Sequence, residues 1–96
     1  MTSAFTVVAT AHFEREFGRL RKRHAELTDL FARTLTILET DPYNRSRTHP
    51  IKKLENVPSG EAQYRIRLGR FRFRYDVDGQ TVYLKRCSLR REDTYR

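Results

Sequence analysis

A strict alternation of apolar and basic residues between positions 64 and 75 constrains the fold of this chain more than any other feature. The apolar members are Tyr64, Ile66, Leu68, Phe71, Phe73 and Tyr75, and the basic members are Arg65, Arg67, Arg72 and Arg74. A period of two is typical of a β-strand that buries one face. Gly69-Arg70 interrupts the alternation, and Asp78-Gly79 is a typical hairpin turn sequence. The pattern predicts a three-stranded antiparallel meander whose last strand is Gln80 to Cys87.

The two turns predict which charges share a face, because opposed residues in a sheet point the same way. A loop at Gly69-Arg70 sets Arg67 opposite Arg72 and Arg65 opposite Arg74. A loop at Asp78-Gly79 sets Tyr83 opposite Arg74 and Lys85 opposite Arg72. One face is then apolar, and the other holds Arg65, Arg67, Arg72, Arg74, Tyr83 and Lys85, with acids only at its ends, Glu61 and Asp78.

A face of nearly uniform charge is unfavourable by itself, since like charges directly opposite one another cost roughly 0.2–1 kcal/mol per pair. Guanidinium groups bind phosphate oxygens through two parallel hydrogen bonds, and an interleaved tyrosine can stack on a base. We therefore interpret this face as a binding site for a phosphate-bearing partner. The alternative is an ordinary solvent-facing sheet surface covered by long arginine stems.

The N-terminal half predicts one strand and two helices. The segment 4–9 is short, apolar and contains β-branched residues, which indicates a strand. Thr10 can cap a helix that runs to about Lys22, with Phe13, Phe17 and Leu20 on one face. A second helix is expected from about Ala25 to Thr40, where Asp41-Pro42 ends it. The two should form an antiparallel hairpin over the apolar face of the sheet.

Residues 43–60 are interpreted as an ordered loop with at most one turn of helix, anchored by Ile51, Leu54 and Val57. The fold class is therefore α+β: one N-terminal strand, a helical hairpin, and a three- to four-stranded antiparallel meander. No linker or repeat interrupts the chain, so we expect residues 1–96 to form a single domain.

Composition supports an anionic partner. The chain has 20 Lys and Arg against 12 Asp and Glu, a formal charge of +8, and such an excess attracts phosphate backbones unless it serves solubility alone. No apolar run suits a membrane span or a signal peptide, so a cytoplasmic protein without a membrane partner is expected. The single cysteine, Cys87, excludes an internal disulfide, and the scattered histidines give no zinc pattern. We expect no metal and no cofactor.

Conventional catalytic groups are scarce. Cleavage of RNA by its own 2′-hydroxyl needs activation of that hydroxyl, stabilisation of the phosphorane and a proton for the leaving oxygen. Arginine supplies the second of these, but its pKa above about 12 makes it a poor base. His49 is the best placed acid or base, although a surface loop histidine is its simpler interpretation, and Cys87 is interpreted as a packed thiol.

The stretch from Tyr64 to Gly79, Val82-Tyr83-Leu84 and the end Arg90-Arg91-Glu92-Asp93-Thr94-Tyr95 resemble the RelE/ParE superfamily of toxins from bacterial and archaeal toxin–antitoxin pairs. The strand, the helical hairpin and the segment 49–54 match its layout too. The resemblance implies a RelE/ParE-like fold, with a sheet like that of microbial ribonucleases, and a cognate antitoxin as partner.

RelE-like members cut mRNA in the ribosomal A site, and the resemblance to this branch assigns roles to individual residues. Arg72 and Arg91 would stabilise the scissile phosphate, Arg67 would belong to the catalytic set, and Tyr95 would stack on a base or assist proton transfer. Arg65, Arg74, Tyr83, Lys85 and Arg90 would bind RNA. Where the RelE pattern has two lysines this chain has Arg65 and Arg67, so no general base is assigned.

Two other functions remain open. ParE-like members share the fold and inhibit DNA gyrase, which would make gyrase the partner. A non-catalytic RNA-binding module would use the same basic face without cleavage. The preferred hypothesis is a ribosome-dependent mRNA endonuclease that inhibits translation.

Overall fold

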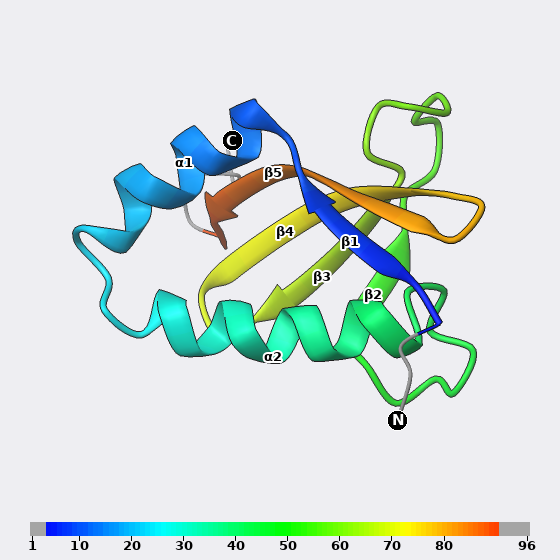
Figure 1. The fold of residues 1–96 in the computed structure, drawn as a ribbon, viewed down its shortest axis with the longest axis horizontal. Helices are drawn as coiled ribbons and strands as arrows, with labels where there is room; N and C mark the ends of the chain where they lie inside the picture. Colours follow the sequence, from blue (N-terminus) through cyan, green and yellow to red (C-terminus); the bar gives the residue numbers. More distant parts are fainter. Residues whose placement is uncertain (1–3, 91–96) are drawn as a thin grey trace.

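The last strand that the structure describes lies inside the sheet. Figure 1 shows the computed structural model, which describes residues 4–90. Along the chain the elements are β1 (Thr6–Ala9), α1 (Ala11–Arg21), α2 (Leu27–Thr40), β2 (Ile51–Lys53), β3 (Tyr64–Leu68), β4 (Phe71–Asp78) and β5 (Thr81–Leu89). The strands form one five-stranded sheet in the order β1-β5-β4-β3-β2. β1 pairs with β5 in parallel and the other pairs are antiparallel, which confirms the predicted α+β class.

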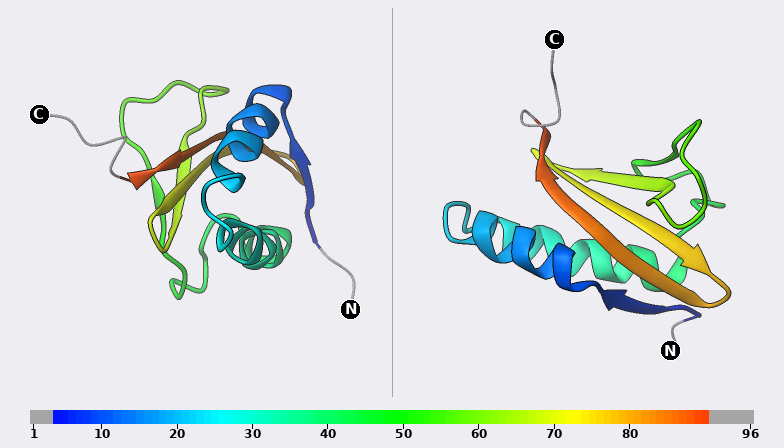
Figure 2. Two further views of the ribbon diagram at one scale, coloured as in Figure 1. Left: turned by 90° about the vertical axis from the view of Figure 1, so that its left-hand side faces the viewer. Right: turned by 90° about the horizontal axis from the view of Figure 1, so that it is seen from above.

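Both helices lie on the same side of the sheet (Figure 2). Thr10 caps α1 as predicted: its Oγ1 accepts a hydrogen bond from the Phe13 N–H at 3.2 Å and donates to the Leu84 carbonyl at 2.9 Å. The second bond ties the start of the helix to β5. α2 begins at Leu27, two residues later than predicted, and ends at Thr40 before Asp41-Pro42.

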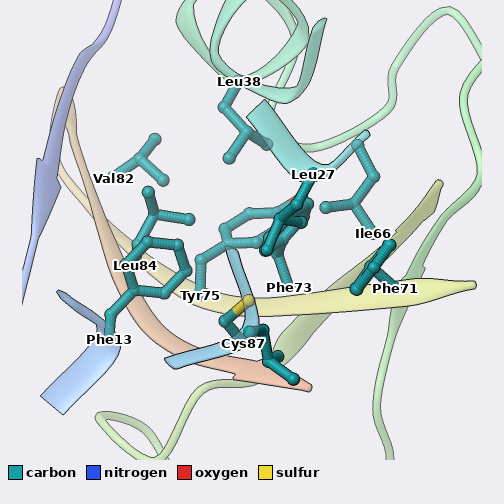
Figure 3. Close-up of a cluster of buried hydrophobic side chains, with 11 residues drawn as sticks. Phe13, Leu27, Leu38, Ile66, Phe71, Phe73, Tyr75, Val82, Leu84 and Cys87 are labelled. Carbon is teal, nitrogen blue, oxygen red and sulfur yellow. The ribbon is translucent and has the colours of Figure 1, made fainter. Parts of the chain in front are cut away.

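The core lies between the helices and the sheet (Figure 3). Apolar side chains from both layers meet there, and the fully buried ones are Phe13, Leu20, Leu27, Leu38, Ile66, Phe71, Phe73, Tyr75, Val82, Leu84 and Cys87. The Tyr75 hydroxyl donates to the Pro42 carbonyl at 2.7 Å, so its polar atom is satisfied inside the core. The apolar half of the alternating pattern is therefore the half that faces the helices.

The predicted register of β3 with β4 is confirmed at every position, from Tyr64 opposite Tyr75 to Leu68 opposite Phe71. The predicted register of β4 with β5 is wrong. The two-residue loop is Gly79-Gln80, because Asp78 pairs with Thr81, and a bulge follows between Arg74 and Tyr75. Beyond the bulge Arg74 lies opposite Arg86, not Tyr83, and Arg72 lies opposite Ser88, not Lys85.

The segment 43–60 is not only a loop. It contains β2, which pairs with β3 so that Ile51 lies opposite Ile66 and Lys52 opposite Arg65. β2 is the fourth antiparallel strand that the predicted range allowed. In the part of the chain that the structure describes, neither helix has the length and apolar character needed to cross a bilayer.

Candidate functional site

A row of four cationic side chains crosses the sheet on the face opposite the helices. The register places Lys52 of β2 beside Arg65 of β3, Arg65 beside Arg74 of β4, and Arg74 beside Arg86 of β5. A parallel row holds Arg67, Arg72 and Ser88. Neighbouring strands are about 4.7–4.9 Å apart. The charges on adjacent strands therefore lie within a Debye length of one another, and dissolved ions do not fully screen their repulsion.

A hollow of about 290 Å³ opens over these rows, and its lining residues are Leu54, Arg65, Arg72, Arg74, Arg86 and Ser88. We call it the arginine hollow. Within residues 4–90 no acidic side chain lines it. Four guanidinium groups line this one small hollow, and guanidinium groups suit tetrahedral anions because their parallel N–H donors match the spacing of the anion's oxygens.

Arg65, Arg72 and Arg74, which the sequence pattern assigned to the basic face, all line this hollow, and Arg74 also has a structural role. Its Nη2 donates to the carbonyls of Glu61 and Ala62 at 3.2 Å and 2.8 Å. Arg74 therefore holds the loop before β3 against the sheet while its side chain lines the hollow.

Asp76 contradicts the prediction that acids lie only at the ends of the basic face. It lies on that face opposite Tyr83, is 8% exposed, and accepts hydrogen bonds from the N–H groups of Ala62 and Gln63 at 2.8 Å and 3.0 Å. Ala62 has a φ of 66°, a conformation that L-residues adopt only when their surroundings compensate for the strain. The carboxylate of Asp76 provides that compensation.

Lys85 and Tyr83 do not join the arginine hollow. The bulge turns Lys85 toward the loop before β3, where its Nζ contacts the Gly60 carbonyl at 3.2 Å and the Asp76 carboxylate at 3.7 Å. Tyr83 lies beside Asp76 and, with Lys85, lines a different recess. The predicted positions of Tyr83 opposite Arg74 and of Lys85 opposite Arg72 are therefore wrong, because the bulge and the shifted register move both residues along the strand.

Arg86 is the lining residue that the sequence prediction missed. Its Nε lies 3.4 Å from the Glu16 carboxylate of α1, and the other oxygen of that carboxylate accepts the Cys87 N–H at 2.8 Å. The signal was a phase change in the apolar positions, which run Val82, Leu84, Cys87 and Leu89. A step of three within a period of two indicates one inserted residue, which is a β-bulge.

The remaining predicted residues lie apart or outside the described chain. Arg67 is on the basic face opposite Arg72 but does not line the hollow, and the Arg90 N–H donates to the Arg70 carbonyl at 2.6 Å beyond the end of β5. Arg91 and Tyr95 lie outside the described residues.

His49 does not line the hollow; its Nε2 lies 3.7 Å from the Asp41 carboxylate in the loop after α2. The described residues contain no group of three His, Cys, Asp or Glu side chains that could hold a metal ion. What the described part of this face offers is a set of charged N–H donors held in place by the sheet.

Comparison with known proteins gives a match of fold. No family model matches the chain, and no curated protein matches its sequence. Among solved structures, a chain of the archaeal RelE–RelB complex from Pyrococcus horikoshii OT3 is similar with a TM-score of 0.67 and 24% identity, covering 91% of this chain and 96% of that one.

A chain of the toxin–antitoxin complex RelBE2 from Mycobacterium tuberculosis is similar with a TM-score of 0.58 and 21% identity, covering 91% of this chain and 99% of that one. Both likenesses span almost all of the chains compared. The fold implied by the sequence resemblance is thereby confirmed, and the chain has a RelE-like α+β fold.

Proposed function

We propose that this chain is the toxin of a toxin–antitoxin pair and that it cleaves mRNA on the ribosome. The observation that carries the proposal is the arginine hollow, where Arg65, Arg72, Arg74 and Arg86 surround a space of about 290 Å³. The RelE-like fold supports the toxin assignment, because the similar chains come from a RelE–RelB complex and from the toxin–antitoxin complex RelBE2. The choice of RNA as the polyanion rests on the sequence resemblance to RelE-like members.

In this proposal the scissile phosphate occupies the hollow. Attack by the neighbouring 2′-hydroxyl adds negative charge to the phosphate oxygens, and guanidinium groups already in place stabilise that charge without reorganising. Arg65 of β3 and Arg72 of β4 line the hollow from adjacent strands and from different rows. The proposal therefore makes these two arginines the central contacts with the phosphate. Arg91 and Tyr95 are proposed to complete the site from the C-terminal segment, with Tyr95 stacking on a base or assisting proton transfer.

The test is cleavage of mRNA in a translating extract. Wild-type protein should produce cuts within codons on ribosomes, and Arg72→Ala should slow cleavage by about 10²–10³-fold, the usual cost of removing one donor to a developing oxyanion. Arg91→Ala should have an effect of the same kind. Arg33→Ala, an exposed arginine on the opposite layer in α2, is the matched control and should leave cleavage unchanged.

Absence of cuts with the wild-type protein, in an extract whose translation it nevertheless stops, would overturn the nuclease proposal. A supercoiling assay with purified gyrase then tests the alternative target, since a nuclease leaves supercoiling untouched. Binding of RNA without cleavage, weakened by Arg72→Ala, would identify a binding module instead.

The antitoxin is proposed from the same fold likeness. A small protein with an acidic segment can cover the basic face, because complementary potentials steer and orient association. Co-expression of a small open reading frame adjacent to this gene should restore growth that the chain alone inhibits. Persistent inhibition in the presence of every neighbouring product would contradict this pairing.

A further inference from the structure

A second recess lies beside the arginine hollow and shares Arg74 and Arg86 with it. Its volume is about 380 Å³, and its other walls are Thr10 and His12 at the start of α1, the loop 60–62, and Lys85. We call it the loop recess. The two shared arginines border both spaces, so a ligand that fills the hollow has the recess as its immediate neighbour.

The two spaces differ in charge. The cations of the loop recess already contact acceptors: Arg74 the carbonyls of residues 61 and 62, Lys85 the Gly60 carbonyl and Asp76, and Arg86 the carboxylate of Glu16. The carboxylate of Glu61 adds negative charge to the wall. Within the described residues no acid lines the hollow, so a phosphate is favoured there, whereas the recess, which has Glu61 in its wall, suits a neutral polar group.

His12 provides a flat ring in this recess. Its Nε2 lies 3.3 Å from Glu16, and its side chain is 53% exposed, so the contact restrains the ring while leaving part of it accessible. Histidine is one of the side chains on which unpaired bases stack. The backbone of the loop 60–62 is held by Asp76 and Arg74, which gives that wall of the recess a fixed shape.

We propose that the loop recess binds the base of the nucleotide next to the phosphate in the arginine hollow, with the base stacked on His12. This inference rests on the proposed function, since it takes single-stranded RNA as the ligand. It adds a base-binding subsite to a face whose arginines contact only the backbone, and it makes His12 a binding residue.

The experiment uses RNA trinucleotides that carry 2′-O-methyl groups and therefore cannot be cleaved. Three further trinucleotides each lack the base at one position, and affinity is measured by NMR titration of the full chain. Wild-type protein should bind one of the three abasic trinucleotides about five- to tenfold more weakly than the intact one, within the range measured for loss of one stacked base. His12→Ala should remove this difference, and His12→Phe should restore it.

Arg15→Ala is the matched control, because Arg15 is an exposed cation of α1 that does not line the recess. It should weaken intact and abasic trinucleotides by the same factor. Equal binding of all four trinucleotides by the wild-type protein, or an unchanged base effect in His12→Ala, would overturn the base subsite even if the extract assay shows cleavage. A base effect that depends on His12 in a chain that cuts no mRNA would retain the subsite and overturn only the nuclease.

Discussion

The carboxylate of Glu16 accepts a hydrogen bond from the backbone N–H of Cys87, with 2.8 Å between the two atoms. Pairing of β1 with β5 stops at Leu84, so one side chain of α1 supplies the acceptor that a longer β1 would have supplied. The same carboxylate contacts Arg86 and His12. Glu16 therefore links the helix, the edge of the sheet, and both spaces of the candidate site.

We expect Glu16→Ala to lower the free energy of unfolding by about 1–3 kcal/mol, because a backbone donor at the sheet edge loses its partner. Urea denaturation measures the change. Glu14→Ala is the control; Glu14 is exposed in the first turn of the same helix and should cost only about 0.3–1 kcal/mol through the helix dipole. Equal losses in the two variants would contradict the role of Glu16.

Asp76→Asn should destabilise the chain by about 1–3 kcal/mol, because an amide has one acceptor oxygen for the two N–H groups that the carboxylate now satisfies. Hydrogen exchange of the Ala62 and Gln63 amides should also become faster. Asp78→Asn changes an exposed aspartate on the same strand and should leave both measurements unaltered. Slow exchange in Asp76→Asn would show that the loop is held by other contacts.

Asp41 is expected to make stability depend on acid pH. Partial burial opposes its ionisation, but hydrogen bonds from the Ser46 hydroxyl and from the N–H groups of Arg45 and Ser46 outweigh it and lower the pKa below 3.8. A depressed pKa adds stability above 3.8 that is lost as the pH falls through the folded value.

The destabilisation caused by Asp41→Asn should therefore be larger near pH 7 than near pH 2. Thermal unfolding at several pH values measures it, with Asp29→Asn on the exposed surface of α2 as the control. A cost of Asp41→Asn that is the same at every pH would show that the carboxylate's charge contributes nothing there.

Gly18→Ala should stabilise the chain by about 0.5–1 kcal/mol. Gly18 lies inside α1, and a Cβ built there has no atom within 4 Å, so the gain in helix propensity comes without a clash. Gly60→Ala is the matched comparison, because its Cβ would be equally unobstructed but its φ is 89°. We expect Gly60→Ala to be destabilising, and a gain in both variants would contradict the conformational argument.

Cys87 should react with a thiol reagent only when the chain unfolds. Burial raises the pKa of its thiol to about 12, with a further contribution from Glu16, and the thiolate is the reactive form. Labelling near pH 8 should be slow in buffer and fast in urea, relative to a free thiol in the same solutions. Immediate labelling of the folded chain would show that the β5 edge opens readily.

The parts of the fold that were predicted correctly are those in which apolar and polar residues alternate regularly along the sequence. Pairing of β3 with β4 followed from uninterrupted alternation on both sides of Gly69. Pairing of β4 with β5 could not be obtained in the same way, because sliding one strand by two residues keeps every side chain on its face. The apolar pattern of Val82 and Leu84 therefore fits both the predicted and the observed register.

The composition of the site was only partly predictable for a related reason. Lys85 and Arg86 are adjacent cations, and only the bulge decides which one faces the hollow. Lys52 was missed because three residues of β2 are too few to show a period. Asp76 follows the alternation, but the loop that its carboxylate holds is distant in sequence and irregular.

The interior position of β5 determines when the sheet can form during synthesis of the chain. Residues 81–89 separate β1 from β4, so during synthesis β1 has no strand to pair with until β5 emerges from the ribosome. Pairing across so much of the chain closes a long loop and is slow compared with local contacts. The basic face, to which β5 contributes Arg86, is thus assembled only after residues 81–89 have been made, and a ribosome that has not yet reached them carries an incomplete site.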